Sequence, residues 1–313
     1  MKKIVVTLDS TQISSFLECP RLWDYGDRQH LTLKVQEPNN AMMIGSYGHK
    51  LLEIYYKGRA AHLSGADAIQ KAKAFDPDTE SCECGHEQSK HIIIGGTPFC
   101  HKGCSCKTFT PKPYPLPKDI RADVARRFEL HCYTYANRDF IVTDERAVEV
   151  GFSHRLYESS TRLYILEGRI DLFNPKDPEM NTIGFVDHKF QMQRRDLYEK
   201  SVQFRNYAYV TKARLAIINY IRMAKNIDGN TFQRKLISFS PMEHLWWEKE
   251  LLKIYNAIAG YIVGEAFPPN WNSCQGRFNT RCAFTSLCEE INSDIVEAKK
   301  EQLYVLKEQW RPW

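Results

Sequence analysis

No apolar run in the sequence approaches the roughly 18 residues that span a membrane, so we expect no membrane-embedded segment. The start, Met1 to Asp9, holds two lysines but lacks the long apolar stretch of a secretory signal, which predicts a cytoplasmic protein. Internal repeats and low-complexity tracts are missing too, and charged residues make up 26% of the chain, which argues against wholesale disorder. The motif G-x-x-x-x-G-K-[ST] is also absent, so this chain has no P-loop motor of its own.

What is present suffices for a full hydrophobic core. The 313 residues are 43% hydrophobic, enough for one large domain or for one domain with an insert. The net charge of +5 is compatible with a polyanionic partner, but it is only a weak indication of one.

Cysteine is plentiful. Ten cysteines in a chain without an export signal predict metal ligation rather than disulfides. Four of them are unevenly spaced, with Cys19 alone near the N-terminus and Cys274, Cys282 and Cys288 crowded toward the C-terminus. If these four bound one ion or cluster, they would link the N-terminal and C-terminal ends of the fold. Thiolates suit an iron–sulfur cluster or zinc, and a spacing looser than the paired C-x-x-C of zinc ribbons favours the cluster.

A second group of potential metal ligands lies in residues 77–117, a polar stretch rich in Gly, Pro, Cys and His. It has too few apolar residues to fold unaided, which predicts a small structural zinc site; the alternative is a loop with redox-sensitive thiols. Ligand pairs from the two halves would close the loop best, although the sequence leaves the choice of four open. The candidates are Cys82, Cys84, His86, His91, Cys100, His101, Cys104 and Cys106. Cys132, alone in a predicted helix, is expected to be a buried core thiol.

Hydrophobic periodicity predicts an α/β fold. Helices are expected at residues 11–26 (capped by Ser10 or Thr11), 42–58, 65–75, 117–137, 196–213 and 241–265. Strands are expected at residues 147–152, 161–173, 182–190, 215–222 and 232–239. This order indicates a mixed β-sheet core flanked by helices. The expected parts are a helical N-terminal part (1–76), the Cys/His-rich insert (77–117), the α/β core (118–268) and a C-terminal cysteine segment with a tail (269–313).

Polar groups suited to metal-dependent phosphodiester cleavage follow one another along this pattern. The segment G-S-Y-G-H places His49 near the start of the second predicted helix. The segment E-G-R-I-D places Asp171 on a strand, and F-V-D-H-K places Asp187 and Lys189 on the next strand. A Q-x-x-x-Y pattern follows on a helix, with its two members on one face. Each piece alone is weak, but their order and placement together favour a functional site over a structural coincidence.

The chemistry requires these residue types. Two carboxylates on adjacent strands can hold Mg²⁺ or Mn²⁺ near a phosphate. Asp187 and Lys189 are two apart on a strand and so point to the same side, where the lysine can position or activate water and neutralise developing charge. His49 is a candidate third ligand, which favours Mn²⁺ somewhat over Mg²⁺. Gln203 and Tyr207 are candidates for contacts with a DNA backbone or base.

In this order the motifs resemble the RecB-like branch of the PD-(D/E)XK nuclease superfamily. With the four cysteines they resemble its iron–sulfur members, which include CRISPR-adaptation exonucleases, the AddB nuclease domain and DNA-replication helicase–nucleases. The resemblance covers about residues 10–60 and 145–290, and it implies a restriction-endonuclease-like fold with a C-terminal iron–sulfur segment. The sequence departs from the family at Phe190, where threonine is common after the lysine.

The resemblance also implies roles residue by residue. The catalytic Mg²⁺ or Mn²⁺ would be held by His49, Asp171, Asp187 and the backbone carbonyl of His188, with Lys189 as the catalytic lysine. Gln203 and Tyr207 match the Q-x-x-x-Y motif of the family. The ligands of a 4Fe-4S cluster would be Cys19, Cys274, Cys282 and Cys288.

The leading interpretation is a metal-dependent DNA exonuclease that acts on single strands or DNA ends in recombination, repair or phage-type DNA processing. A helicase or recombination protein would then be a partner in trans. A structure-specific endonuclease of the same fold is the alternative enzyme, and the sequence does not separate the two, because directionality depends on how the groove threads a strand. A catalytically silent DNA-binding scaffold with a structural cluster is the alternative from another class, and the complete metal-and-lysine set argues against it.

Overall fold

A computed structural model describes residues 3–34, 40–76, 116–178, 181–192, 198–275 and 281–307, together with the backbone of residues 91–94 and 97–100. Within these ranges, every helix is either too short or too polar to cross a bilayer.

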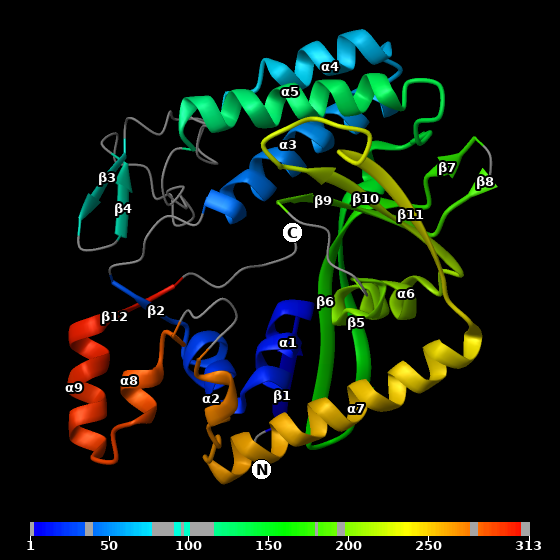
Figure 1. Cartoon of the computed structure of the whole chain (residues 1–313). Coiled ribbons are helices and arrows are strands. Elements are labelled where there is room, and N and C mark those ends of the chain that lie inside the picture. The colour runs from blue at the N-terminus through cyan, green and yellow to red at the C-terminus, as the bar shows by residue number, and fades with distance from the viewer. Residues whose placement is uncertain are drawn as a thin grey trace.

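The centre of the molecule is a six-stranded mixed β-sheet (Figure 1). Its strands are β1 (Ile4–Leu8), β5 (Val148–Glu158), β6 (Arg162–Phe173), β9 (Phe185–Gln191), β10 (Leu215–Arg222) and β11 (Phe232–Ser238). The order across the sheet is β1-β6-β9-β10-β11, and β5 pairs with β6. The β1–β6 and β9–β10 pairs are parallel, whereas β5–β6, β6–β9 and β10–β11 are antiparallel. The predicted mixed sheet is therefore confirmed.

Helices cover both faces of this sheet, which confirms the predicted α/β class. One face carries α3 (Asn40–Ala60), α4 (Gly65–Lys73) and α5 (Lys118–Thr134), at the top of Figure 1. The other carries α1 (Ser10–Glu18), α6 (Val202–Thr211) and α7 (Pro241–Gly264).

Separate apolar clusters fill the two interfaces between helices and sheet. Tyr56 of α3 and Phe128 of α5 belong to the first cluster, together with Val186 of β9. Cys132 belongs to it as well and is 3% exposed, so its predicted burial is confirmed. On the other face, Leu166 of β6 packs with residues of α1 and α7. Strands covered on both sides bury side chains of both orientations, which explains the nearly unbroken apolar run of β10.

The predicted single helix over residues 11–26 is wrong. Asp9, rather than Ser10 or Thr11, caps α1, which ends at Glu18. Cys19 is extended, with φ −161° and ψ 118°, and a short helix, α2 (Pro20–Trp23), and a π-helical turn, η1 (Asp24–Arg28), follow. Proline disfavours helical geometry at the residue before it, so Pro20 breaks the helix at the cysteine.

Three other predicted boundaries are also corrected. The strand expected over residues 147–152 continues as β5 to Glu158. The helix expected over residues 196–213 begins only at Val202, because Ser201 caps α6 by accepting a hydrogen bond from the Phe204 N–H; a 3₁₀ turn, η5 (Tyr198–Lys200), precedes it. The strand expected over residues 182–190 is divided into β8 (Asn181–Thr182), which pairs with β7 (Lys176–Asp177), and β9.

Elements from the two ends of the chain lie side by side at the lower left of Figure 1. The strands β2 (Leu31–Leu33) and β12 (Tyr304–Leu306) form an antiparallel pair. Tyr25 of η1 packs with Phe284, with Leu287 of α8 (Thr285–Cys288) and with Tyr304, and α9 (Ser293–Leu303) lies beside them. The elements β2, β12 and α8 are too short to stand out in the sequence, and α9 lacks a buried apolar face that would mark it.

The Cys/His-rich insert is described only in part. Its strands β3 (His91–Ile94) and β4 (Thr97–Cys100) form an antiparallel pair that sets the backbone of His91 opposite Cys100. The other zinc candidates lie outside the described residues: Cys82, Cys84, His86, His101, Cys104 and Cys106. The zinc site therefore stays a prediction.

Candidate active site

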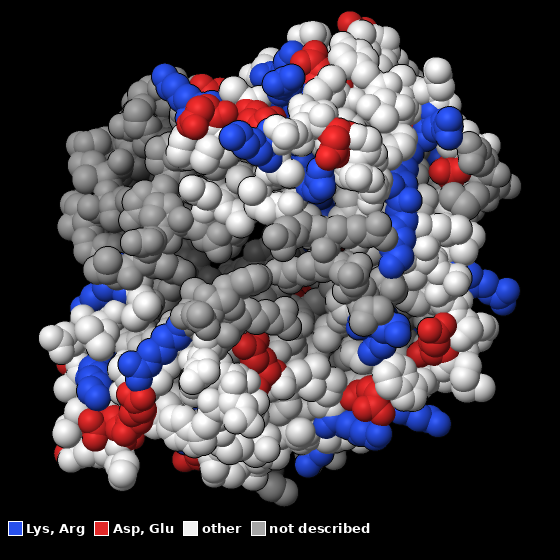
Figure 2. All heavy atoms as spheres, in the orientation of Figure 1, with Lys and Arg blue, Asp and Glu red and all other residues white. Residues whose placement is uncertain are grey.

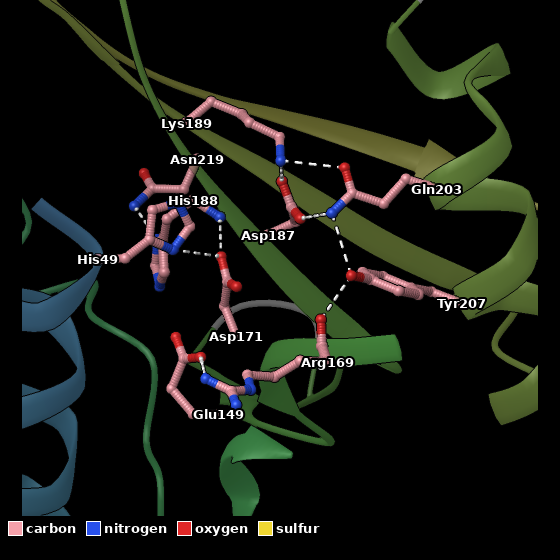
Figure 3. A network of polar contacts seen from close by, with 10 residues as sticks. All are labelled: His49, Glu149, Arg169, Asp171, Asp187, His188, Lys189, Gln203, Tyr207 and Asn219. Carbon is pink, nitrogen blue, oxygen red and sulfur yellow. Dashed lines mark hydrogen bonds and ion pairs between the residues drawn. The ribbon is translucent and has the colours of Figure 1, made fainter. Parts of the chain in front are cut away.

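The polar residues singled out in the sequence meet where β6 and β9 run beside the first half of α3 (Figure 3). Gly48 lets the helix come this close, because a Cβ at that position would lie 2.5 Å from the ring of Phe190 on β9. The next residue, His49, is thereby held over the sheet. Phe190, the residue after Lys189, therefore packs directly against α3 at Gly48.

Asp171 of β6 and His49 of α3 form one half of the site. His49 Nδ1 lies 3.3 Å from Asp171 Oδ2, and the backbone N–H of His188 donates to the same oxygen at 2.6 Å. Burial alone would lower the pKa of His49, but the Asp171 carboxylate outweighs it and raises that pKa to about 9. Burial would raise the pKa of Asp171, and the neighbouring His49 instead holds it below its ordinary value. With these pKa shifts the pair is an imidazolium and a carboxylate at neutral pH.

Asp187 and Lys189 of β9 form the other half. The Lys189 Nζ lies 2.6 Å from Asp187 Oδ2 and donates to Gln203 Oε1 at 3.1 Å. Asp187 is fully buried, which raises its pKa to about 6 even though Lys189 acts in the opposite direction. Burial would lower the pKa of Lys189, but Asp187 raises it above its ordinary value, so the lysine stays an ammonium.

Gln203 and Tyr207 of α6 contact the same half. Gln203 Nε2 donates to Asp187 Oδ1 and to the hydroxyl of Tyr207, each at 3.0 Å. The Tyr207 hydroxyl donates to the backbone carbonyl of Arg169 on β6. In the structure this pair therefore ties α6 to both strands of the site, and its predicted contact with DNA stays a prediction.

A buried polar chain that the sequence analysis missed lies behind β9. Asn219 Nδ2 lies 2.8 Å from His188 Nδ1, and Asn219 Oδ1 lies 3.0 Å from His131 Nε2. Because an amide nitrogen can only donate, His188 Nδ1 must be unprotonated, and burial lowers the pKa of both histidines. The imidazole of His188 is thus neutral and stacked on Tyr56, while its backbone contacts Asp171. A single amide inside the apolar strand β10 was the sequence signal for this chain.

A further carboxylate, Glu149 of β5, was also missed. Ligand atoms of His49, Glu149 and Asp171 all lie within 4.8 Å of one another, and they are the only such group among the described residues. Burial, reinforced by Asp171, raises the pKa of Glu149 to about 7. One imidazole and carboxylates form a donor set that fits Mn²⁺ or Mg²⁺. The raised pKa of Glu149 shows that burial and the nearby Asp171 disfavour its charged form, which a divalent cation would stabilise.

Divalent-metal binding at this site should depend steeply on pH. Because the pKa of His49 is about 9 without metal, a cation that binds there at pH 7.5 must displace the imidazolium proton. We expect the Mn²⁺ affinity to rise by up to about tenfold per pH unit between about pH 7 and 8.5. Calorimetry in buffers of different ionisation enthalpy would count the released protons. In His49→Gln the pH dependence should flatten, and an equally steep dependence in that variant would contradict the assignment.

The four predicted cluster thiols converge at the place where the two ends of the chain meet. Cys19 Sγ accepts a hydrogen bond from the Asn270 N–H at 3.2 Å, and the Cys282 N–H donates to the Cys274 carbonyl at 2.9 Å. Burial raises the pKa of Cys288 to about 11, and the other three thiols add to this rise because they lie near it. None of the four forms a disulfide.

A family model described as the PD-(D/E)XK nuclease superfamily matches residues 8–289. A solved structure described as "Crystal structure of SSO0001" is 17% identical, covers 55% of this chain and 71% of that chain, and gives a TM-score of 0.30. No curated protein matches the chain. The matched range begins in β1, before Cys19, and ends just after Cys288.

Proposed function

The chain belongs to the PD-(D/E)XK nuclease superfamily, and from this premise we propose that it is a DNA exonuclease of the RecB-like, iron–sulfur branch. Membership implies a nuclease that uses a divalent metal ion and acts on DNA. The proposal adds that the substrate is single-stranded DNA or a DNA end, in recombination, repair or phage-type processing. In this function the protein would act in the cytoplasm, together with a helicase or recombination protein supplied in trans.

One observation supports the proposal most. His49, Asp171, Asp187 and Lys189 come from α3, β6 and β9, and their side chains meet in one place (Figure 3). Contacts at 3.3 Å or less join them in pairs, and the His188 N–H links Asp171 to the strand of Asp187. A scaffold without catalytic activity would gain nothing from holding a half-buried lysine beside two buried carboxylates.

Each side chain then has a distinct task. When bound, a divalent cation would polarise the phosphate and lower the pKa of a water molecule. Asp171 and Asp187 would hold it, with His49 and the His188 carbonyl. Lys189 keeps its ammonium beside Asp187, where it can orient water and neutralise charge that develops on the phosphate. Gln203 restrains both of these residues and so keeps the lysine from swinging away.

The surface is compatible with a polyanionic substrate. On the face seen in Figure 2, Lys and Arg side chains form a row at the right, over the β10–β11 side of the sheet. The lower part of the same face carries both signs of charge. Phosphate contacts of this kind would position a strand without reading its sequence.

We assign a 4Fe-4S cluster to Cys19, Cys274, Cys282 and Cys288 within this proposal. The thiols meet beside the apolar cluster of Tyr25, Phe284, Leu287 and Tyr304, which limits access of water. The spacing of these cysteines along the sequence, looser than the paired C-x-x-C of zinc ribbons, favours the cluster over zinc.

Wild-type protein tests the function directly. With Mn²⁺, it should shorten end-labelled linear DNA and leave closed circular DNA intact, because an exonuclease needs an end. Cleavage of circular single strands would identify the endonuclease alternative instead. No cleavage of any substrate by iron-replete protein would leave only the DNA-binding scaffold.

The insert should contain zinc. Elemental analysis of metal-replete protein is expected to find zinc in addition to iron, because a polar segment rich in Cys and His requires a metal to fold. Deletion of residues 82–106 with a short linker should remove the zinc and leave the iron content unchanged. Zinc-free wild-type protein would contradict the proposed site and indicate a loop with free thiols.

A further inference from the structure

The backbone of Glu149 is unusual for a strand. Its φ of 54° lies in the left-handed region, which a residue with a side chain adopts only at an energetic cost. Its neighbours keep a regular register on both sides, with Val148 opposite Leu172 and Val150 opposite Ile170. Glu149 is therefore a local distortion of the β5–β6 pair, separate from the register shift between Arg155 and Tyr157.

The same register sets Glu149 opposite Asp171. On the other side of β6, Leu172 is paired with Val186, so Asp187 stands opposite Asp171 one step beyond the last paired position. One carboxylate from each of three adjacent strands thus lies in a single row, at the usual strand spacing of about 4.8 Å. Like charges directly opposite on neighbouring strands repel each other and destabilise the fold unless a cation or a proton compensates them.

The three carboxylates of this row are not equally well neutralised by the basic side chains beside them. Lys189 lies 2.6 Å from Asp187, and His49 lies 3.3 Å from Asp171. Glu149 has Arg169, whose Nη1 is 3.8 Å away and whose side chain is 37% exposed. Glu149 itself is 18% exposed, so a cation from solution can reach it. Its carboxylate therefore has the weakest compensation of the three.

We propose that Glu149 is a further side-chain ligand of the divalent cation at this site, acting with His49 and Asp171. The three ligand atoms already lie within 4.8 Å of one another, a spacing that one ion can bridge. The inference rests on the proposed function for the presence of a cation, and it adds a residue that none of the sequence motifs contains. The left-handed backbone then has a role, because it turns the Glu149 side chain toward the partners shown in Figure 3.

Calorimetric titration of DNA-free, iron-replete protein with Mn²⁺ tests the inference. Glu149→Gln keeps the size and the backbone but removes the charge, and it should weaken Mn²⁺ binding by at least about tenfold. Glu167→Gln is the matched control, a glutamate of the neighbouring strand that accepts a hydrogen bond from Ser153 outside this group, and it should bind like the wild type. Equal Mn²⁺ affinity of Glu149→Gln and wild type would overturn the inference.

Thermal unfolding separates a ligand from a merely structural glutamate. Without added divalent cation at pH 8, Glu149→Gln should melt at the same temperature as wild type or higher, because one repelling charge opposite Asp171 is gone. Added Mn²⁺ should then raise its melting temperature less than that of wild type. A glutamate that served only to pair with Arg169 would give the opposite result: a lower melting temperature without metal and an unchanged Mn²⁺ shift.

DNA cleavage keeps this inference distinct from the proposed function. If wild type cleaves DNA and Glu149→Gln binds Mn²⁺ normally, the inference is wrong and the nuclease function stands. If Glu149→Gln loses Mn²⁺ affinity and wild type cleaves no DNA, the ligand assignment holds and the function is wrong.

Discussion

Asp187→Asn is expected to reduce DNA cleavage by at least about 10³-fold, since it removes a metal ligand and the counter-charge of the catalytic lysine together. Asparagine has nearly the same shape, so it fits the fully buried position and can still accept the hydrogen bond from Gln203. The fold and the affinity for DNA should therefore change little. Single-turnover cleavage of labelled DNA, circular dichroism melting and fluorescence anisotropy measure the three quantities separately.

Lys189→Met should be as inactive as Asp187→Asn, but for a different reason. It removes the ammonium and leaves both carboxylates in place, so Mn²⁺ binding should be unchanged or tighter. Asp187→Asn should instead weaken Mn²⁺ binding. Equal Mn²⁺ affinity in the two variants would contradict this division of roles.

The control for both is Asp119→Asn, an exposed aspartate in the first turn of α5. It applies the same chemical change at the surface, outside the residues of the site, and should leave cleavage within about twofold of wild type. More than a few per cent of residual activity in Asp187→Asn, with a normal control, would refute the catalytic assignment.

Cys19→Ser is expected to have the largest effect on stability. A cluster held by Cys19 and by the three C-terminal cysteines closes a loop of most of the chain, and by analogy with a disulfide this is worth about 4–5 kcal/mol. For a protein of this size, such a loss lowers the melting temperature by on the order of 10 °C. The variant should also be colourless and iron-poor, and it should lose nuclease activity even though Cys19 contacts none of the catalytic residues.

Cys132→Ala is the matched control for the cluster. Cys132 is as buried as Cys19, but it lies in α5, in the core cluster on the opposite face of the sheet. Its loss should cost about 1 kcal/mol through a small cavity and leave colour and iron content unchanged. If the wild-type protein is colourless and iron-free, yet fully active and no more stable than Cys19→Ser, the cluster is refuted. Zinc or free thiols would then be the remaining interpretations of the four cysteines.

Most of what could be predicted depends on the spacing of residues that are close together in the sequence. The D-x-K pair lies two apart on a strand and the Q-x-x-x-Y pair lies four apart on a helix, so their shared faces follow from local geometry. The superfamily predicted from these motifs is confirmed by the family match over residues 8–289. The α/β class was predictable for the same reason, because the change from a helical to a strand period is visible within short windows of sequence.

Prediction from apolar periodicity was least reliable where a single residue interrupts a helix. The apolar spacing of residues 11–26 is helical throughout, yet Pro20 breaks the helix at Cys19 and leaves that residue extended. The break is readable in the sequence, and it sets Cys19 where its thiol meets the C-terminal cysteines.

Glu149 and Asn219 depended on the tertiary structure. Val148-Glu149-Val150 looks like an ordinary alternation of buried and exposed strand residues, and nothing local shows that Asp171 stands opposite the glutamate. Asn219 likewise acquires its partners only because β10 lies beside β9 and α5 packs over both. Residues near in sequence share a face through the helix or strand period, and the sequence determines that much by itself. Neighbours across strands are set by register and by the packing of distant segments, which only the folded chain decides.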